Sequence, residues 1–237
     1  VKRVSMELGG HAPFIVFEDA DLDEAVIGAM ANKYRNSGQV CVSANRIYVH
    51  ESVYDEFSNR LAEKSSQLKV ADGRTEGAQI GPLITPLAFK KVEEHVEDAI
   101  EKGAKILTGG TNDNSGVQFY KPTVLTNINN NMKIYYEETF GPVAPIIKFK
   151  DENEVIEMAN DTKYGLAGYF YSRDIGKIWR VAEALEYGMV GINAGVISTE
   201  VAPFGGIKES GIGREGAEEG IEEYLEIKYL CFDGVEK

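Results

Sequence analysis

The amino-acid sequence predicts an α/β fold in which a largely parallel, twisted sheet is flanked by helices. Two observations support this class. Short apolar runs rich in β-branched residues alternate with helical patterns from one end of the chain to the other. The helical patterns also have recognisable start and stop residues, such as Thr85-Pro86 and Gly103. Because strands separated by helices are joined by crossover connections, we expect neighbouring strands to be parallel.

The predicted elements follow one another without an internal repeat. The run Pro13–Phe17 is bounded by Gly10 and Asp19 and is too short for a helix, so it is the first buried strand. Asp21 can then cap a helix that runs towards Arg35. The later elements are the strand Ile47–His50, a helix opened by a Ser52/Asp55 capping box, a helix from Thr85-Pro86 to Gly103, the strand Lys105–Leu107, the helix Glu152–Asn160, the strand Leu166–Tyr171, the helix Asp174–Tyr187 and the strand Met189–Ile192.

The C-terminal end follows a separate pattern. Tyr224–Phe232 alternates partly as a strand, well apart from the core elements, and such a strand needs a partner edge in its own chain or in another. We therefore expect a catalytic domain over residues 1–215 and a C-terminal segment over residues 216–237 that includes an oligomerisation strand. The chain begins at Val1 without an initiator Met, so we expect a piece of a longer protein.

Composition excludes several classes of partner. The chain has 237 residues with 25 Lys+Arg against 38 Asp+Glu, and this balance argues against binding to nucleic acid or to an anionic membrane. The two cysteines form no CxxC pair and the three histidines have no zinc spacing, so no metal site is predicted. No apolar run approaches the ~20 residues of a membrane-spanning helix. With nothing that resembles a signal peptide, a cytoplasmic location is expected.

Three residues in glycine-containing turns could take part in chemistry. Cys41 lies in Gly38-Gln39-Val40-Cys41, between a helix end and a strand, and is either a small buried side chain or a nucleophile. A place at the edge of a parallel sheet favours the nucleophile, and we expect loop N–H groups to lower its pKa. Glu7 and Glu138 each precede glycines, and each is either an exposed acid or part of a site.

Taken together, four motifs in a fixed order identify a family. These motifs are Glu7-Leu8-Gly9-Gly10, Gly38-Gln39-Val40-Cys41, Glu138-Thr139-Phe140-Gly141-Pro142 and Pro203-Phe204-Gly205-Gly206-Ile207-Lys208-Glu209-Ser210-Gly211. In this order they resemble the signature motifs of the aldehyde dehydrogenase superfamily, over essentially the whole chain. The resemblance implies the C-terminal, cysteine-bearing half of such an enzyme. The family's N-terminal nucleotide-binding half has no counterpart here, so we expect this chain alone to be inactive or nearly so.

The resemblance also implies a mechanism. Cys41 would attack the aldehyde carbon, hydride would pass from the thiohemiacetal to NAD or NADP, and Glu7 would activate the water that hydrolyses the thioester. Glu138 would bind the nicotinamide ribose hydroxyls, and Phe140 would pack beside the ring. Glu226 matches a family acid that relays protons to the base, although an exposed strand residue explains it equally well.

The substrate class follows from two further positions. Arg35, six residues before Cys41, and Ser198, before the Pro203 motif, lie in contexts that look like succinate-semialdehyde dehydrogenases. There the matching Arg and Ser bind the substrate's distal carboxylate, which suits a guanidinium fork and a hydroxyl donor. The alternative for Arg35 is a solvated residue at a helix end. Ser43 replaces a second Cys found in some members, which excludes a regulatory disulfide of that type.

Other interpretations stay open at this point. A broad-specificity aldehyde dehydrogenase would leave Arg35 without a role in substrate binding. A CoA-acylating enzyme would use CoA in place of water, and Glu7 as a water-activating base argues against it. A non-catalytic relative could keep the scaffold alone. The expected partners are a small-molecule aldehyde, the absent N-terminal half and further copies of the chain in a homodimer or homotetramer.

Overall fold

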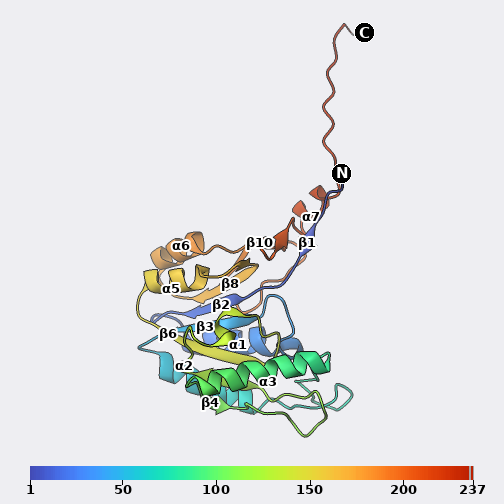
Figure 1. The fold of residues 1–237 in the computed structure, drawn as a ribbon. Coiled ribbons are helices and arrows are strands. Elements are labelled where there is room, and N and C mark those ends of the chain that lie inside the picture. The colour runs from blue at the N-terminus through green and yellow to red at the C-terminus, as the bar shows by residue number, and fades with distance from the viewer. Residues whose placement is uncertain (235, 237) are drawn as a thin grey trace.

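A seven-stranded sheet forms the core of the protein (Figure 1). The computed structural model describes residues 1–234 and 236, and it orders the strands β4-β5-β6-β3-β2-β8-β9. Neighbouring strands are parallel except β4 and β5, which confirms the predicted α/β class with a largely parallel sheet. The strands are β2 (Ala12–Val16), β3 (Ala44–His50), β4 (Lys105–Thr108), β5 (Thr123–Thr126), β6 (Val143–Phe149), β8 (Ala167–Tyr171) and β9 (Met189–Ile192).

Helices cover both faces of this sheet. Alternate residues of β2 show the division: Phe14 packs with the helices α1 and α2, whereas Ile15 packs with the helices of the opposite face. This alternation is the period-two geometry of a strand that is buried on both sides. The first face is covered by α1 (Leu22–Tyr34) and α2 (Tyr54–Ser66), and the second by α3 (Pro86–Glu101), α4 (Lys133–Tyr136), α5 (Glu152–Asn160) and α6 (Ile175–Ala184).

Two helices begin at the capping residues that the sequence predicted. The Asp21 carboxylate accepts hydrogen bonds from the backbone N–H groups of Asp23 and Glu24 and caps α1. The Thr85 hydroxyl accepts a hydrogen bond from the Ala88 N–H at 3.1 Å, with proline at the first position of α3. Each cap satisfies backbone donors that have no partner within the helix.

Other local predictions were wrong. No side chain caps α2, because Val53 occupies the cap position and the Ser52 hydroxyl bonds the His50 ring instead. The helix α6 ends at Ala184 rather than at Tyr187, since Leu185 already has an extended backbone. The strands β5 and β6 were missed as elements. β6 contains Pro145, and a proline argues against a central strand.

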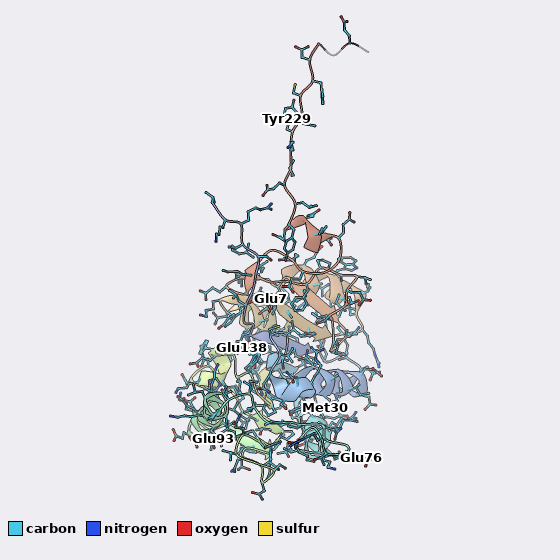
Figure 2. All side chains as sticks on the ribbon, turned by 90° about the vertical axis from the view of Figure 1, so that its right-hand side faces the viewer. Glu7, Met30, Glu76, Glu93, Glu138 and Tyr229 are labelled. Atoms are coloured by element: carbon cyan, nitrogen blue, oxygen red, sulfur yellow. The ribbon has the colours of Figure 1, made fainter. Side chains whose placement is uncertain are left out.

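Short elements lie outside the main sheet. The antiparallel pairs are β1 (Met6–Glu7) with β11 (Gly211–Ile212) and β7 (Tyr164–Gly165) with β10 (Ile207–Lys208), and the last helix is α7 (Glu219–Glu222). Beyond α7, the chain runs away from the body, as Figures 1 and 2 show at Tyr229.

The predicted strand Tyr224–Phe232 is not formed in the single chain. The pairing of this segment with another subunit stays a prediction. Val235 and Lys237, which also belong to the predicted C-terminal segment, lie outside the described residues. Within the described part of the chain, no helix combines the length and apolarity needed to cross a membrane.

Candidate active site

Cys41 lies in a tight turn just before β3. The chain leaves α1 through the 3₁₀ turn η1 (Arg35–Gly38), in which Asn36, Ser37 and Gly38 all have positive φ angles. A side chain at Gly38 would collide with the Gly141 carbonyl, so only glycine fits this approach. The turn places Cys41 at the amino-terminal end of β3. This corrects the comparison with open α/β folds, whose ligands bind at the carboxyl ends of the strands.

Three segments distant in sequence meet around two glycines. The Gly10 N–H donates a hydrogen bond to Glu138 Oε1 at 3.1 Å. A Cβ atom on Gly10 would lie 2.5 Å from the Cys41 carbonyl oxygen, and one on Gly9 would lie 3.1 Å from Glu138 Oε2. The absence of side chains at both glycines therefore lets the Glu138 and Cys41 segments approach each other. Glu7, at the end of β1, lies on the same side of the molecule as Glu138 (Figure 2).

The Glu7 carboxyl and the Cys41 thiol interact directly and affect each other's ionisation. Burial raises the pKa of Glu7, and its interaction with the Cys41 side chain opposes this rise. Burial, followed by the charge of Glu7, raises the pKa of the Cys41 thiol to about 11, while the N–H groups of Cys41 and Val42 act in the opposite direction. The loop N–H groups thus act in the predicted direction, but burial and the charge of Glu7 outweigh them, and the pKa rises. Glu7 Oε1 is buried, and it has no hydrogen-bond partner among the described residues.

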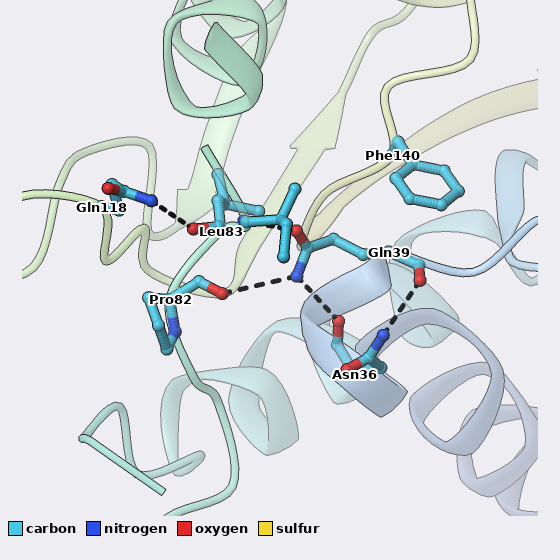
Figure 3. A pocket seen from close by; sticks show the side chains of 7 residues that line it. Asn36, Gln39, Pro82, Leu83, Gln118 and Phe140 are labelled. Atoms are coloured by element: carbon cyan, nitrogen blue, oxygen red, sulfur yellow. Dashed lines mark hydrogen bonds between the residues drawn. The ribbon is translucent and has the colours of Figure 1, made fainter. Parts of the chain in front are cut away.

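Glu138 and Phe140 border the adjoining surface. Burial raises the pKa of Glu138, although the Gly10 N–H and nearby lysines favour its charged form. Phe140 has a φ of 55° and lines a hollow of about 450 Å³. Figure 3 shows Gln39 between the Phe140 ring and Pro82, with its amide nitrogen donating to the Asn36 and Pro82 carbonyls at 3.2 and 3.4 Å. The hollow thus has an aromatic side and an amide side.

Arg35 and Ser198 are brought together from opposite halves of the chain. Arg35 follows α1 and Ser198 lies in the loop after β9, yet both line one narrow hollow, which has no room for a water-sized molecule in this structure. Val42, the residue next to Cys41, lines the same hollow, as does Tyr169. A basic side chain and a hydroxyl therefore share a hollow that reaches the residue beside the thiol.

Glu226 does not join this group. Its side chain is 82% exposed and lies 3.3 Å from the guanidinium of Arg3. It belongs to the segment that leaves the body after α7, and its carboxylate pairs with Arg3 rather than with Glu7. The arrangement gives no support to a proton relay through Glu226.

Sequence reasoning missed a buried lysine beneath the site. Lys33 is fully buried, and its Nζ donates to the Ala44 carbonyl at 2.8 Å and to Asn45 Oδ1 at 3.4 Å. Burial lowers the pKa of Lys33 to about 7, while the charge of Glu138 raises it. One signal could have revealed it: Lys33 follows Ala25 and Ala29 at helical spacing on the buried face of α1.

Comparison with known proteins identifies the family of this chain. The family model described as "Aldehyde dehydrogenase family" matches residues 1–230. The chain is 59% identical over 231 residues to succinate-semialdehyde dehydrogenase [NADP(+)] of Escherichia coli, and 61% identical over 231 residues to glutarate-semialdehyde dehydrogenase of Pseudomonas putida. It is also 57% identical over 237 residues to a 3-sulfolactaldehyde dehydrogenase of Pseudomonas putida. The chain belongs to the aldehyde dehydrogenase family, which confirms the resemblance found in the motifs.

Solved structures extend this similarity to the fold. The crystal structure of succinate-semialdehyde dehydrogenase from Burkholderia pseudomallei superposes with a TM-score of 0.97 at 60% identity, covering 98% of this chain and 48% of that one. The E. coli relative is likewise matched over 98% of this chain and 48% of its own length. The chain therefore spans about half the length of the relatives it matches.

Proposed function

We propose that this chain carries the catalytic cysteine of an NAD(P)-dependent aldehyde dehydrogenase, which oxidises an aldehyde to a carboxylic acid. The main support is the contact of the Cys41 thiol with the Glu7 carboxyl, whose Oε1 is buried without a partner in the described part of the chain. A nucleophile beside a base with a free oxygen is the arrangement that covalent catalysis requires. The names of the relatives support the same reaction class.

The first step is attack by Cys41 on the aldehyde carbon. With a raised pKa, the thiol is protonated at neutral pH and has to lose its proton as it attacks, and Glu7 is the adjacent acceptor. The carbon–sulfur bond forms while the carbonyl π electrons move to oxygen. The backbone N–H groups of Cys41 and Val42, which lie close to the sulfur, are donors that can stabilise this oxyanion.

Oxidation and hydrolysis complete the reaction. A bound nicotinamide cofactor would supply the hydride acceptor, and loss of hydride from the thiohemiacetal carbon would leave a thioester on Cys41. Glu7 releases the thiol proton to solvent and is then free to take a proton from water as the resulting hydroxide attacks the thioester. The carbon–sulfur bond breaks, the carboxylic acid leaves, and the Cys41 thiolate takes up the proton held by Glu7. Aldehyde, NAD(P)⁺ and water thus give acid, NAD(P)H and a proton. Because Glu7 serves this last step, water rather than CoA is the proposed acyl acceptor.

Glu138 and Phe140 are the proposed cofactor residues of this chain. Glu138 Oε1 is fixed by the Gly10 N–H, whereas Oε2 faces the bare Cα of Gly9, where a side chain would fill the space. This leaves a carboxylate oxygen open to ribose hydroxyls, with the Phe140 ring available to pack against a flat heterocycle. We propose NAD or NADP as the cofactor. The E. coli relative is named for NADP(+), and a betaine aldehyde dehydrogenase of Staphylococcus aureus, 41% identical, is described in complex with NAD+.

Succinate semialdehyde is the proposed substrate. Arg35 and Ser198 are both exposed at the edge of a hollow that Val42 also lines, so an anionic group bound to these two side chains would direct the other end of a short aldehyde towards Cys41. The named substrates of the three relatives all combine an aldehyde with a carboxylate or sulfonate, which is the chemistry that these two side chains bind. A broad-specificity enzyme is the alternative, and in it Arg35 would have no role.

The proposed enzyme needs more than this chain. We propose that a nucleotide-binding half completes the cofactor site, and that copies of the protein associate through Tyr224–Phe232. The support is the half-length match to the relatives and the exposed apolar residues Ile227, Tyr229 and Phe232. A cytoplasmic location also remains a proposal. We use "complete enzyme" below for this chain together with its nucleotide-binding half.

The test compares two aldehydes in the complete enzyme. Succinate semialdehyde and butanal, which lacks the carboxylate, are each oxidised with NAD⁺ and with NADP⁺, and cofactor reduction is followed by absorbance. We expect kcat/KM to favour succinate semialdehyde at least tenfold, and Arg35→Gln to remove most of this preference without changing butanal oxidation. The matched control is Arg74→Gln, because Arg74 pairs with Asp72 on the surface.

Each contrary outcome contradicts a different part of the proposed function. Equal kcat/KM values for the two aldehydes would contradict carboxylate recognition and favour the broad-specificity alternative. Turnover that requires CoA in place of water would favour the acylating enzyme. No turnover of either aldehyde would leave only the non-catalytic scaffold.

A further inference from the structure

The buried side-chain amide of Asn32 links the loop that contains Ser198 to α1, the helix that precedes Arg35. Asn32 is 5% exposed, and its Nδ2 donates a hydrogen bond to the Gly195 carbonyl at 2.9 Å. Its Oδ1 accepts a hydrogen bond from the Ala44 N–H at 2.6 Å. A single side chain thus joins α1, the first residue of β3 and the loop that follows β9.

The backbones around this amide are in direct contact. A side chain at Gly195 would overlap the Gly28 carbonyl, and one at Gly28 would overlap the Tyr171 hydroxyl. Gly28 and Asn32 are four residues apart in α1, so they lie on one face of this helix, and Arg35 directly follows its last residue. The backbone of the loop therefore packs directly against the backbone of α1, with no side chain between them.

This contact fixes the geometry of the hollow that Arg35 and Ser198 share. Asn32 lines that hollow, as do Val42 and Tyr169, and the Tyr169 hydroxyl donates to the Val42 carbonyl at 2.8 Å. The loop is held at Gly195, three residues before Ser198. Its distance from Arg35 and from the turn that bears Cys41 thus depends on the two Asn32 hydrogen bonds.

We propose that Asn32 is a positioning residue that holds Ser198 opposite Arg35 and thereby selects aldehydes with a distal anionic group. The inference rests on the proposed function, since it concerns the same anion-binding hollow. Asn32 touches neither the reacting atoms nor the cofactor residues, so its effect on a substrate without the anion is small. An amide suits this role because it is neutral and both donates and accepts.

The test uses two variants that loosen the same loop by different means. Asn32→Leu removes both hydrogen bonds, and Gly195→Ala pushes the loop off the helix while leaving Asn32 intact. In the complete enzyme, we expect each variant to raise KM for succinate semialdehyde about tenfold or more, with kcat and butanal oxidation within about threefold of the wild type. If Asn32→Leu does not fold, as judged by circular dichroism, Asn32→Ser takes its place.

A matched control comes from Asn160. Its Nδ2 donates to the Ala184 carbonyl at 2.8 Å and its Oδ1 accepts from the Glu186 N–H at 3.0 Å, so it makes the same double bridge outside the hollow. Asn160→Leu should lower the melting temperature as Asn32→Leu does but leave the ratio of the two substrates unchanged. A purely structural role for Asn32 predicts equal behaviour of the two variants, and that result would overturn the inference.

The substrate preference of the wild-type enzyme shows whether a negative result contradicts this inference alone or the proposed function as well. A wild-type enzyme that oxidises both aldehydes equally well contradicts the proposed carboxylate recognition, and the inference falls with it. A wild-type preference for succinate semialdehyde that survives Asn32→Leu and Gly195→Ala overturns the inference alone.

Discussion

Two polar clusters in this molecule differ in how completely their groups are paired. Arg46 is fully buried, and its guanidinium donates to the carbonyls of His11, Met158 and Ala159 and to the Tyr187 hydroxyl, at 2.9 to 3.1 Å. Around Cys41 a carboxylate is left incompletely paired: Glu7 Oε1 has no partner within the described residues, whereas the unpaired atom beside Arg46, His11 Nδ1, belongs to a ring whose pKa is held well below its usual value by burial. Buried polar groups are normally satisfied, so the paired cluster is typical of structure and the unpaired one of chemistry.

The cluster around Arg46 also helps to position the cluster around Cys41. Arg46 holds the carbonyl of His11, and His11 follows Gly10, whose N–H positions Glu138. The carbonyls of Met158 and Ala159 lie at the end of α5, where the helix dipole favours a cation. A guanidinium with five donors suits this arrangement of oxygens without any carboxylate. The comparison therefore predicts that substitutions in the Arg46 cluster affect stability and that substitutions in the Cys41 cluster affect the rate of catalysis.

The largest expected effect is on rate, from loss of the thiol. Cys41→Ser in the complete enzyme should lower kcat at least about 10⁴-fold, because a serine hydroxyl is a much weaker nucleophile without a matched base. The melting temperature should stay close to that of the wild type. The matched control is Cys231→Ser, in the exposed C-terminal segment. Retained activity in Cys41→Ser would contradict the assignment of the nucleophile.

Replacement of Glu7 should affect rate and thiol ionisation in opposite ways. Glu7→Gln should lower kcat about 10²- to 10⁴-fold, since it removes the base for both proton transfers. It also removes a negative charge that disfavours the thiolate, so the pKa of Cys41 should fall below about 11. Iodoacetamide labelling of Cys41 at neutral pH should therefore become faster as turnover becomes slower.

The control for this pair of effects is Glu209→Gln, because Glu209 pairs with Lys163 on the surface. It should change neither turnover nor labelling. Slower labelling of Cys41 in Glu7→Gln would contradict the charge effect, even if turnover also fell.

Sequence reasoning succeeded where the signal is local and failed where it depends on distant contacts. Asp21 and Thr85 were identified as caps because a cap bonds the next few residues of its own chain. The motif order singled out Glu7, Cys41 and Glu138, but nothing in the sequence indicated that the pKa of Cys41 would rise overall. That shift comes from burial and from Glu7, which lies 34 residues away in sequence. No local pattern reports such a neighbour.

The same distinction explains the missed cations. Arg46 lies within a strand among apolar residues, and its oxygen partners come from the residue before β2, from α5 and from the segment after α6. Lys33 faces backbone at the start of β3. Helical spacing could have placed Lys33 on a buried face, but only the fold shows which oxygens accept its hydrogen bonds.

Loss of Arg46 should affect stability rather than rate. Arg46→Met in the complete enzyme should lower the free energy of unfolding by about 3–5 kcal/mol, because it leaves several buried oxygens without donors. Urea denaturation followed by tryptophan fluorescence measures the change. Arg180→Met is the control: Arg180 makes an exposed pair with Glu152, and we expect no measurable change. A loss of stability no greater than that of Arg180→Met would contradict the role of the paired cluster.

The smallest expected effect is a dependence of stability on pH that comes from Lys33. Its pKa of about 7 in the folded state lies below the unfolded value of about 10.4, so between these values the unfolded chain binds more protons. Stability from this group therefore rises with pH above about 7 and is lost as pH falls towards 7. Lys33→Met removes the dependence, so the wild type should gain about 1–2 kcal/mol relative to this variant between pH 7 and pH 8.5.

Urea midpoints of the complete enzyme at pH 7, 7.75 and 8.5 provide the measurement. Only the change with pH is compared, because Lys33→Met also leaves the Ala44 carbonyl without its donor. Lys102→Met is the control, since Lys102 pairs with Asp98 at the surface of α3 and should give a curve parallel to the wild type. Parallel curves for Lys33→Met as well would mean that the ammonium keeps its proton in the folded protein. Lys33 would then belong with Arg46, as a buried cation satisfied by backbone oxygens, and the contrast between the two clusters would rest on Glu7 and Cys41 alone.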